Sequence, residues 1–170
     1  MKRFYEISDK VEEYNWYIRE HRNNVLRAWK EMQQRCKNEP FVYDDWKYAI
    51  LNQMVETHDL SKYSTEEFSA YRQWFYPCEG EERDEEAFNA AWKSHYENEE
   101  NSHHWEHWVG KEETDSLFQW FSYVTMILDW VAMGYKFGDT ALEYYERNKD
   151  KIWIEPKYVE FVERILKIMS

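Results

Sequence analysis

The chain has 170 residues, enough for one domain with a substantial core. Hydrophobic residues make up 43% of it and aromatic residues 19%, which excludes an intrinsically disordered chain. The net charge of −12 repels a phosphate backbone and an anionic lipid surface, so we expect neither a nucleic acid polymer nor a membrane as a partner.

The cysteines and the apolar stretches agree with this setting. Cys36 and Cys78 show no CxxC spacing and are too few for a disulfide framework, so we expect two reduced thiols. The charged N-terminal segment lacks the apolar run of a signal peptide, and these features together predict a cytoplasmic protein. The most apolar stretch, Leu117–Met133, falls short of the ~20 apolar residues of a membrane span. We therefore expect a core helix there.

Apolar residues follow helical spacing almost throughout, and no strand-like alternation persists. This predicts an all-α protein, a single compact helical bundle formed by residues 1–170. In chain order, the expected helices run from Ser8 or Asp9 to about Arg35, from Asp44–Asp45 to Glu56, from a capping box at Ser64–Glu67 to just before Pro77, from about Asp84 to Asn98, from a cap at Thr114–Asp115 to Gly134, from Asp139–Thr140 to about Asn148, and from Pro156 to Met169.

One histidine lies on the apolar face of the first expected helix. His21 follows Tyr14 and Ile18 and precedes Val25 at spacings of three and four residues, which places all four on one face. A histidine there is either a hydrogen-bonded core residue or a ligand.

Asp129 is out of place in the same sense. It lies in the segment FSYVTMILDWVAMG, where no helix face is plainly exposed to water. A buried carboxylate without a partner costs on the order of several kcal/mol, so it must be paired, protonated or bound to a cation. A hydrogen bond to a Tyr or Trp is the purely structural alternative.

Together with the doublet His58-Asp59, at the end of the second expected helix, His21 and Asp129 form a candidate set of metal ligands. His21, His58, Asp59 and Asp129 come from three helices that can converge in a bundle, and nitrogen and oxygen ligands of this kind suit a transition metal or a Mg²⁺-like ion. Further histidines between Asp59 and Asp129 would serve a second metal: His95, His103, His104 and His107. We expect one or two divalent ions per chain, with Mg, Mn, Fe, Co, Ni and Zn all open.

The order His, His-Asp, Asp resembles the HD-domain superfamily of metal-dependent phosphohydrolases. The resemblance covers roughly residues 9–133 and implies an HD-domain-like helical bundle that binds one or two metals. By position it implies that His21, His58, Asp59 and Asp129 are metal ligands, and that His95, His103 and His104 are candidates for a second metal. Lys62 matches a lysine that often follows the doublet in that superfamily and faces the substrate phosphate.

A closer likeness is to a small family of uncharacterised bacterial and phage proteins. The matching segments here are HDLSKYSTEEF at His58–Phe68, YRQWFYP at Tyr71–Pro77, AWKSH at Ala91–His95, HHWEHW at His103–Trp108 and LDWVAMGYKFGDT at Leu128–Thr140. That family implies no particular activity. Its motif favours His103 and His104 as ligands, whereas helical spacing would place His103 and His107 on one face and His104 elsewhere, so the choice stays open.

The leading hypothesis is a phosphohydrolase acting on a small phosphorylated metabolite, with a nucleotide as the expected substrate. Asp59 and Lys62 are the expected catalytic residues, and Lys62 would bind the substrate phosphate as a point charge. Candidate proton acceptors are Glu66, Glu67 and Glu106, and candidate rings for stacking a base are Tyr71, Trp74, Trp105 and Trp108, for which core packing is the alternative. A di-iron oxygenase and a non-catalytic nucleotide- or protein-binding protein are the alternative functions.

Overall fold

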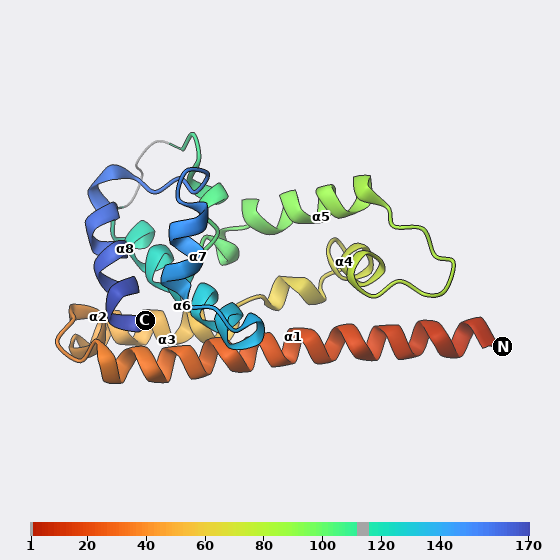
Figure 1. Cartoon of the computed structure of the whole chain (residues 1–170), viewed down its shortest axis with the longest axis horizontal. Coiled ribbons are helices and arrows are strands. Elements are labelled where there is room, and N and C mark those ends of the chain that lie inside the picture. The colour runs from red at the N-terminus through yellow and green to blue at the C-terminus, as the bar shows by residue number, and fades with distance from the viewer. Residues whose placement is uncertain (1, 112–115) are drawn as a thin grey trace.

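The computed structural model describes residues 2–111 and 116–170, and within these ranges the regular structure is entirely helical, which confirms the predicted all-α class. Figure 1 shows a long α1 along one side of the molecule, and α3, α4, α6 and α8 contact it. The elements are α1 (Lys2–Arg35), α2 (Pro40–Tyr43), α3 (Asp45–Thr57), η1 (Leu60–Tyr63), α4 (Phe68–Phe75), α5 (Glu85–Glu97), η2 (Glu99–Asn101), η3 (Trp105–Trp108), α6 (Ser116–Phe137), α7 (Ala141–Asn148) and α8 (Pro156–Met169). A helix with the length and apolar composition of a membrane span is absent from the described part of the chain.

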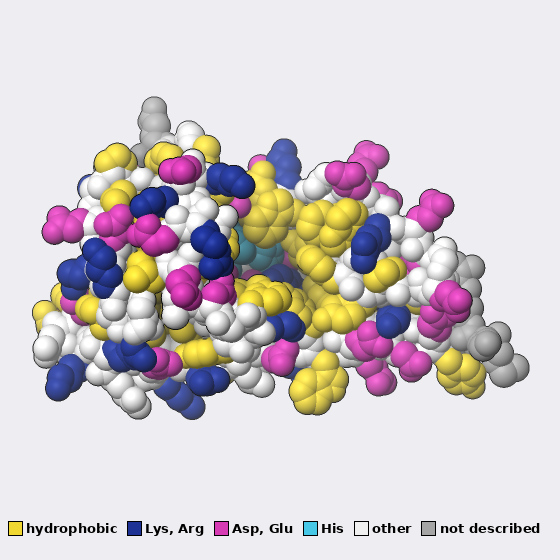
Figure 2. All heavy atoms as spheres, viewed as in Figure 1, with side chains coloured by type: hydrophobic (Ala, Val, Ile, Leu, Met, Phe, Trp, Pro, Cys, Tyr) yellow, Lys and Arg dark blue, Asp and Glu magenta, His cyan; other side chains and the backbone are white. Residues whose placement is uncertain are grey.

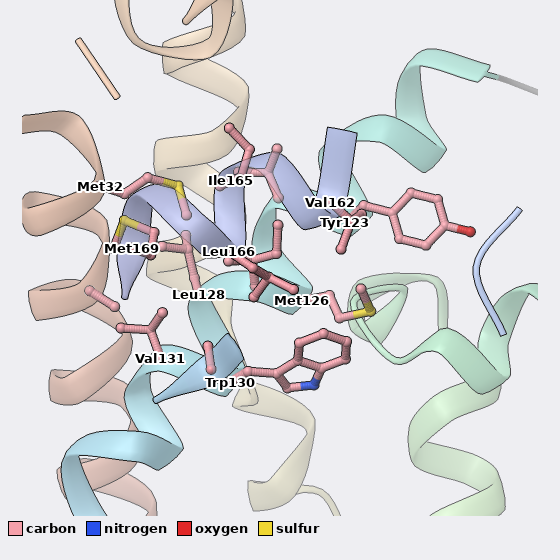
Figure 3. Packing of buried hydrophobic residues seen from close by; sticks show 14 of the residues in the cluster. Met32, Tyr123, Met126, Leu128, Trp130, Val131, Val162, Ile165, Leu166 and Met169 are labelled. Atoms are coloured by element: carbon pink, nitrogen blue, oxygen red, sulfur yellow. The ribbon is translucent and has the colours of Figure 1, made fainter. Parts of the chain in front are cut away.

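The larger hydrophobic core forms where the C-terminal half of α1 meets α3, α6 and α8. Figure 3 shows side chains of α1, α6 and α8 filling it, among them Met32, Leu128 and Leu166, which are all fully buried. Burying such side chains is the main favourable term for a domain of this size. The segment expected to be a core helix is therefore the central helix of this core.

A smaller core lies along the N-terminal half of α1, under α4 and α5. It consists of Tyr14 and Ile18 from α1, Tyr71 from α4 and Ala91 from α5. His21 follows Ile18 by one helical turn and precedes Val25 of the larger core by another, so it sits where the two cores meet. The candidate ligands are gathered at this junction.

Three helices start where their local capping residues predict. Asp84 accepts a hydrogen bond from the backbone N–H of Ala87 (2.9 Å) at the start of α5. Thr140 and Glu143 form a reciprocal capping box at the start of α7, and Pro156 occupies the first turn of α8. Each device satisfies or removes backbone donors within a few residues, so it can be recognised from sequence.

The two longest helices exceed their predicted bounds. Ser8 and Asp9 lie inside α1 and do not cap it, because the helix has already begun at the N-terminal end of the chain. Helix α6 continues past Gly134 to Phe137, since a single glycine weakens a helix without ending it. The cap predicted at Thr114–Asp115 lies outside the described residues.

The capping box predicted at Ser64–Glu67 is wrong. Helix α4 begins at Phe68, with Glu67 at its N-cap position and no side-chain capping bond. Glu67 is instead buried, and its carboxylate lies 2.7 Å from Nδ1 of His95 on α5. A tertiary contact has thus taken the carboxylate that a capping box would require.

Candidate metal centre

The backbone turns sharply at the His58-Asp59 doublet. Helix α3 ends at its C-cap residue His58, and Asp59 adopts a left-handed conformation (φ 59°, ψ 18°), the one positive φ outside glycine in the described ranges. Arg22 of α1 fixes this turn by donating hydrogen bonds to the backbone carbonyls of His58 (3.0 Å) and Glu56 (2.7 Å). Left-handed backbone at a non-glycine residue is strained and tends to occur at functional sites, and here it lets both side chains of the doublet reach the same place.

Four side chains meet beside this turn and form what we call the first cluster: His21, His58, Asp59 and Asp129. Nε2 of His21 lies 3.2 Å from Nε2 of His58, 3.2 Å from Oδ2 of Asp59 and 3.0 Å from Oδ1 of Asp129. Nε2 of His58 lies 3.5 Å from the same Asp129 oxygen and 3.7 Å from Oδ2 of Asp59. The structure therefore brings together all four residues that the sequence singled out on three helices.

The other oxygen of Asp59 faces a second cluster, which consists of Asp59, His95, His103 and His104. Oδ1 of Asp59 lies 3.3 Å from Nε2 of His95 and 3.7 Å from Nε2 of His103. Nε2 of His95 lies 3.0 Å from Nε2 of His104. Asp59 thus belongs to both clusters, with one carboxylate oxygen turned to each.

The spacing of these atoms fits metal coordination. With ligand bonds of ~2.0–2.2 Å, neighbouring ligand atoms on one ion lie roughly 3.0–3.6 Å apart, which is close to the distances within each cluster. Oδ1 of Asp59 and Nε2 of His103 are buried and make no hydrogen bond within the part of the chain that the structure describes. Buried polar atoms are nearly always satisfied, so two unsatisfied ones facing each other across 3.7 Å point to a cation between them.

A shell of hydrogen bonds holds the ring of His95. Nδ1 lies 2.7 Å from the Glu67 carboxylate, 3.1 Å from Oγ of Ser61 and 3.1 Å from Nδ2 of Asn101. With Nδ1 occupied on this side, Nε2 is directed at the second cluster. A carboxylate behind a histidine ligand is a recurrent way to fix the ring and raise its basicity.

The charges of the site are tightly coupled. Burial alone would raise the pKa values of Asp59 and Asp129, but nearby cationic groups and histidines hold both well below the usual range of a carboxyl group. Burial alone would lower the pKa of His21, and these two carboxylates outweigh it and raise that pKa to about 9. The first cluster thus pairs two carboxylates with cations, and a divalent ion there would replace the His21 proton.

The histidines of the second cluster behave differently. Burial lowers the pKa of His104 to about 3, with a further contribution from His95, and lowers the pKa of His103 well below its ordinary value. Both imidazoles are therefore neutral near pH 7. Neutral imidazole is the form that binds a metal ion.

Lys62 lies inside the site. Its Nζ is 2.5 Å from Oδ2 of Asp59, and the side chain is 17% exposed. The lysine expected to bind the substrate phosphate thus forms an ion pair with Asp59 of the doublet. Lys62 also lines a cavity of 330 Å³, which is described below and is distinct from the cavity of the next paragraph.

The clusters open into a cavity of 470 Å³ between α5, η3, α6 and α7. His103, His104 and Asp129 line its inner end, and Glu106 lies beside them with a pKa raised by burial. Figure 2 shows histidine side chains at the bottom of a hollow, with hydrophobic side chains crowded on the flank formed by α4 and α5. A small molecule can therefore reach the ligand atoms from solvent.

The structure shows which of the three neighbouring histidines face the candidate metal centre, a choice that the sequence left open. His103 and His104 precede η3 in non-helical backbone, so helical spacing does not apply to them, and both face the second cluster. His107 is buried elsewhere, with Nδ1 hydrogen-bonded to the backbone carbonyl of Tyr96 (2.8 Å) and Nε2 2.7 Å from Nζ of Lys111. The expectation that His104 points away from His103 is wrong.

The remaining candidate proton acceptors and stacking rings also differ in whether they lie at a cavity. Glu66 is exposed, and Trp108 is buried with its indole N–H donated to the carbonyl of Ser102 (2.8 Å), which is a packing role. Trp74 stacks on Phe88 with ring centroids 4.6 Å apart. Trp105 lines the 470 Å³ cavity, and Tyr71 lines a second cavity considered below.

The sequence reading missed the residues that hold the site in place. Asn101 is buried and donates hydrogen bonds to Oγ of Ser61 (2.7 Å) and to the carbonyl of His95 (3.0 Å). Arg22, which holds the turn at the His58-Asp59 doublet, was also not predicted. A polar residue beside His21 on α1 and an Asn before the His103-His104 pair are the hints that the sequence offers, and neither has a specific pattern.

Fold and site together define an all-α protein with a buried His/Asp cluster able to hold metal. Residues 10–168 match a protein family described as a family of unknown function (DUF5662), and the chain belongs to that family. No curated protein and no solved structure matches the chain. The family match does not itself connect the chain to the HD-domain superfamily.

Proposed function

We propose that this protein is a metal-dependent phosphohydrolase acting on a small phosphorylated metabolite, with a nucleotide as the expected class. The observation that carries the proposal is the shared carboxylate of Asp59, whose two oxygens face two adjoining ligand clusters. Two ions held by these two clusters would suit an in-line displacement at phosphorus, because they would stabilise both the attacking and the leaving oxygen. The order of the ligands in the HD-domain superfamily supports the same assignment.

The residues of the chain can be given roles in this reaction. A divalent metal, when bound, supplies Lewis acidity toward a phosphoryl oxygen and lowers the pKa of a water molecule that it coordinates. Lys62 provides a cationic donor for another phosphate oxygen. Glu106 lies in the cavity beside His103 and His104, and burial raises its pKa, so it is placed to take up a proton from the water that attacks phosphorus.

Elemental analysis and an activity panel test this proposal. Protein purified without chelator should hold about two divalent ions per chain, as two-metal sites do, and should hydrolyse phosphate monoesters from a broad nucleotide panel. His104→Ala should lose about one ion, since it removes a ligand of the second cluster only. His107→Ala is the control, because His107 is a buried neighbouring histidine that faces neither cluster. Metal-loaded protein without phosphatase activity would overturn the proposal.

One observation favours a second candidate. Three of the four ligands in the second cluster are imidazoles, and nitrogen-rich sites suit iron. A di-iron oxygenase would therefore purify with iron and consume O₂ in the presence of a substrate, without releasing phosphate. Metal content with neither activity would favour the non-catalytic binding function.

A further inference from the structure

An aromatic cavity adjoins the candidate metal centre on the side away from α6 and α7. It has a volume of 330 Å³ and lies between the N-terminal half of α1, η1, α4 and α5. Its lining residues are Tyr14, Tyr17, Lys62, Tyr71, Phe75, Phe88 and Trp92. This volume falls within the range of small-molecule sites, ~300–1,000 Å³.

The walls of the aromatic cavity are rings that support one another. Phe88 meets Tyr71 and Phe75 edge to face, with ring centroids 5.8 Å and 5.7 Å away. Trp92 stacks on His95 at 5.9 Å, so this wall of the cavity is also the outer wall of the second cluster. A flat ligand in the cavity would therefore have its far end close to the ligand atoms and to Lys62.

The polarity of the aromatic cavity is as specific as its shape. Among the residues that the structure describes, Lys62 is the single charged one in the lining, although the chain contains 34 acidic residues against 22 basic ones. The hydroxyl group of Tyr71 is buried and finds no hydrogen-bond partner among the described residues, and the residue is 3% exposed. An unsatisfied buried hydroxyl is costly, which suggests that a ligand completes it.

The lining also lacks the groups that read one base against another. Among the described residues it contains no Asn, Gln, Arg, Asp or Glu, so its polar groups besides Lys62 are the Tyr hydroxyls and the indole N–H of Trp92. Stacking on aromatic side chains accepts any base, because every base has a π face. The 470 Å³ cavity is less suitable for such a ring, since Glu106, Asp129 and Asp139 line it and would lose hydration when an apolar ring covered them.

We infer that the aromatic cavity holds the flat ring of the substrate, so that the protein selects phosphate monoesters carrying an aromatic ring over sugar phosphates and discriminates weakly among bases. The placement of the phosphate at Lys62 and the metal clusters rests on the proposed function. The placement of the ring rests on the cavity alone, so the two can fail separately.

Binding of AMP and ribose 5-phosphate to the full chain tests the inference, because the two compounds differ at one carbon, which carries adenine in AMP and a hydroxyl group in ribose 5-phosphate. Equilibrium dialysis with chelator present prevents turnover, and circular dichroism verifies that the chain stays folded. AMP should bind about tenfold or more tightly than ribose 5-phosphate, as expected for one stacked base, and GMP, CMP and UMP should lie within about tenfold of AMP. Equal binding of AMP and ribose 5-phosphate would overturn the inference.

Substitution of two exposed phenylalanines, one in each cavity, tests the two cavities separately. Phe75 lies at the rim of the aromatic cavity and is 52% exposed, whereas Phe137 lines the 470 Å³ cavity and is 68% exposed, so neither replacement removes a fully buried ring. Phe75→Ala should weaken AMP binding roughly tenfold and leave ribose 5-phosphate binding unchanged, while Phe137→Ala should leave both unchanged. The reverse pattern would place the ring in the other cavity and overturn the inference.

Tyr71→Phe provides a second, isosteric measurement. It removes only the unpaired hydroxyl group, so the free protein should be as stable as wild type or more stable, while AMP binding weakens by about tenfold. Unchanged AMP binding in both Tyr71→Phe and Phe75→Ala would overturn the inference. AMP binding without phosphatase activity in metal-loaded protein would instead refute the proposed function and leave the ring site standing.

Discussion

Lys62 is the side chain that best reveals how the buried charges of the site are balanced. Its Nζ lies 2.5 Å from Oδ2 of Asp59, the oxygen that also faces His21 and His58. Burial lowers the pKa of Lys62, but the Asp59 carboxylate outweighs that effect and raises it to about 12. Lys62 is therefore fully charged at neutral pH and neutralises the carboxylate that both clusters share.

We expect Lys62→Met to destabilise the metal-free protein by about 2–4 kcal/mol. A rise in pKa from 10.5 to about 12 corresponds to ~2 kcal/mol, and removing one partner of a buried ion pair costs ~3–5 kcal/mol. Methionine retains the packing of the aliphatic stem, so the loss reports the charge. Because the folded-state pKa is raised, this stabilisation is fully present below pH 10.5 and is lost as the pH rises through about 12. A measurement near neutral pH therefore captures all of it.

Urea unfolding with chelator and with saturating metal is the assay. A metal ion in the first cluster neutralises Asp59 in place of Lys62, so the loss should shrink to less than about 1 kcal/mol when metal is saturating. By the same linkage, Lys62→Met should bind that metal more tightly than wild type, whereas phosphatase activity should fall. Lys62→Arg, which keeps the charge, is the control. Equal destabilisation with and without metal, or none in chelator, would refute the idea that Lys62 and a metal share one carboxylate oxygen.

Two further substitutions test the supporting structure. Glu67→Gln should weaken metal binding in the second cluster by roughly ten- to hundredfold and leave the first cluster unchanged, because Glu67 orients His95 alone. Competition titration with a metal chelator measures this, and an equal loss at both clusters would count against it. Gly134→Ala should destabilise the protein by about 1–3 kcal/mol, since its Cβ would lie 2.3 Å from the backbone oxygen of Asp139. Thermal unfolding measures that loss, and an unchanged Tm would mean that the α6–α7 turn relaxes freely.

The sequence by itself determined the helical class and the starts of several helices. Caps at Asp84 and Thr140 and the proline at the start of α8 act over three or four residues, so their effects can be read locally. It also identified His21 and Asp129, because a polar residue among apolar ones at helical spacing is visible without knowing the fold. The first cluster is therefore the part of the site that was predicted most completely from the sequence.

Tertiary structure decided which of the remaining polar residues act together. Glu67 could cap α4 or hold His95, and packing against α5 selected the second, since a buried histidine needs a partner more than an exposed helix end does. His103 and His104 face the same cluster because their backbone is not helical, a fact that the expected spacing could not supply. Helical periodicity predicts neighbours only along a helix.

The shared carboxylate and the aromatic cavity are the features that the sequence alone could not predict. Asp59 serves two clusters only because its backbone is left-handed and Arg22, from another helix, holds the preceding turn. The rings of the cavity come from α1, α4 and α5, and along the chain each looks like an ordinary core residue. Chain-local forces determine the helices, whereas the distances between side chains on different helices follow from how those helices pack. That packing decided where the candidate ligand atoms and the lining of the aromatic cavity lie.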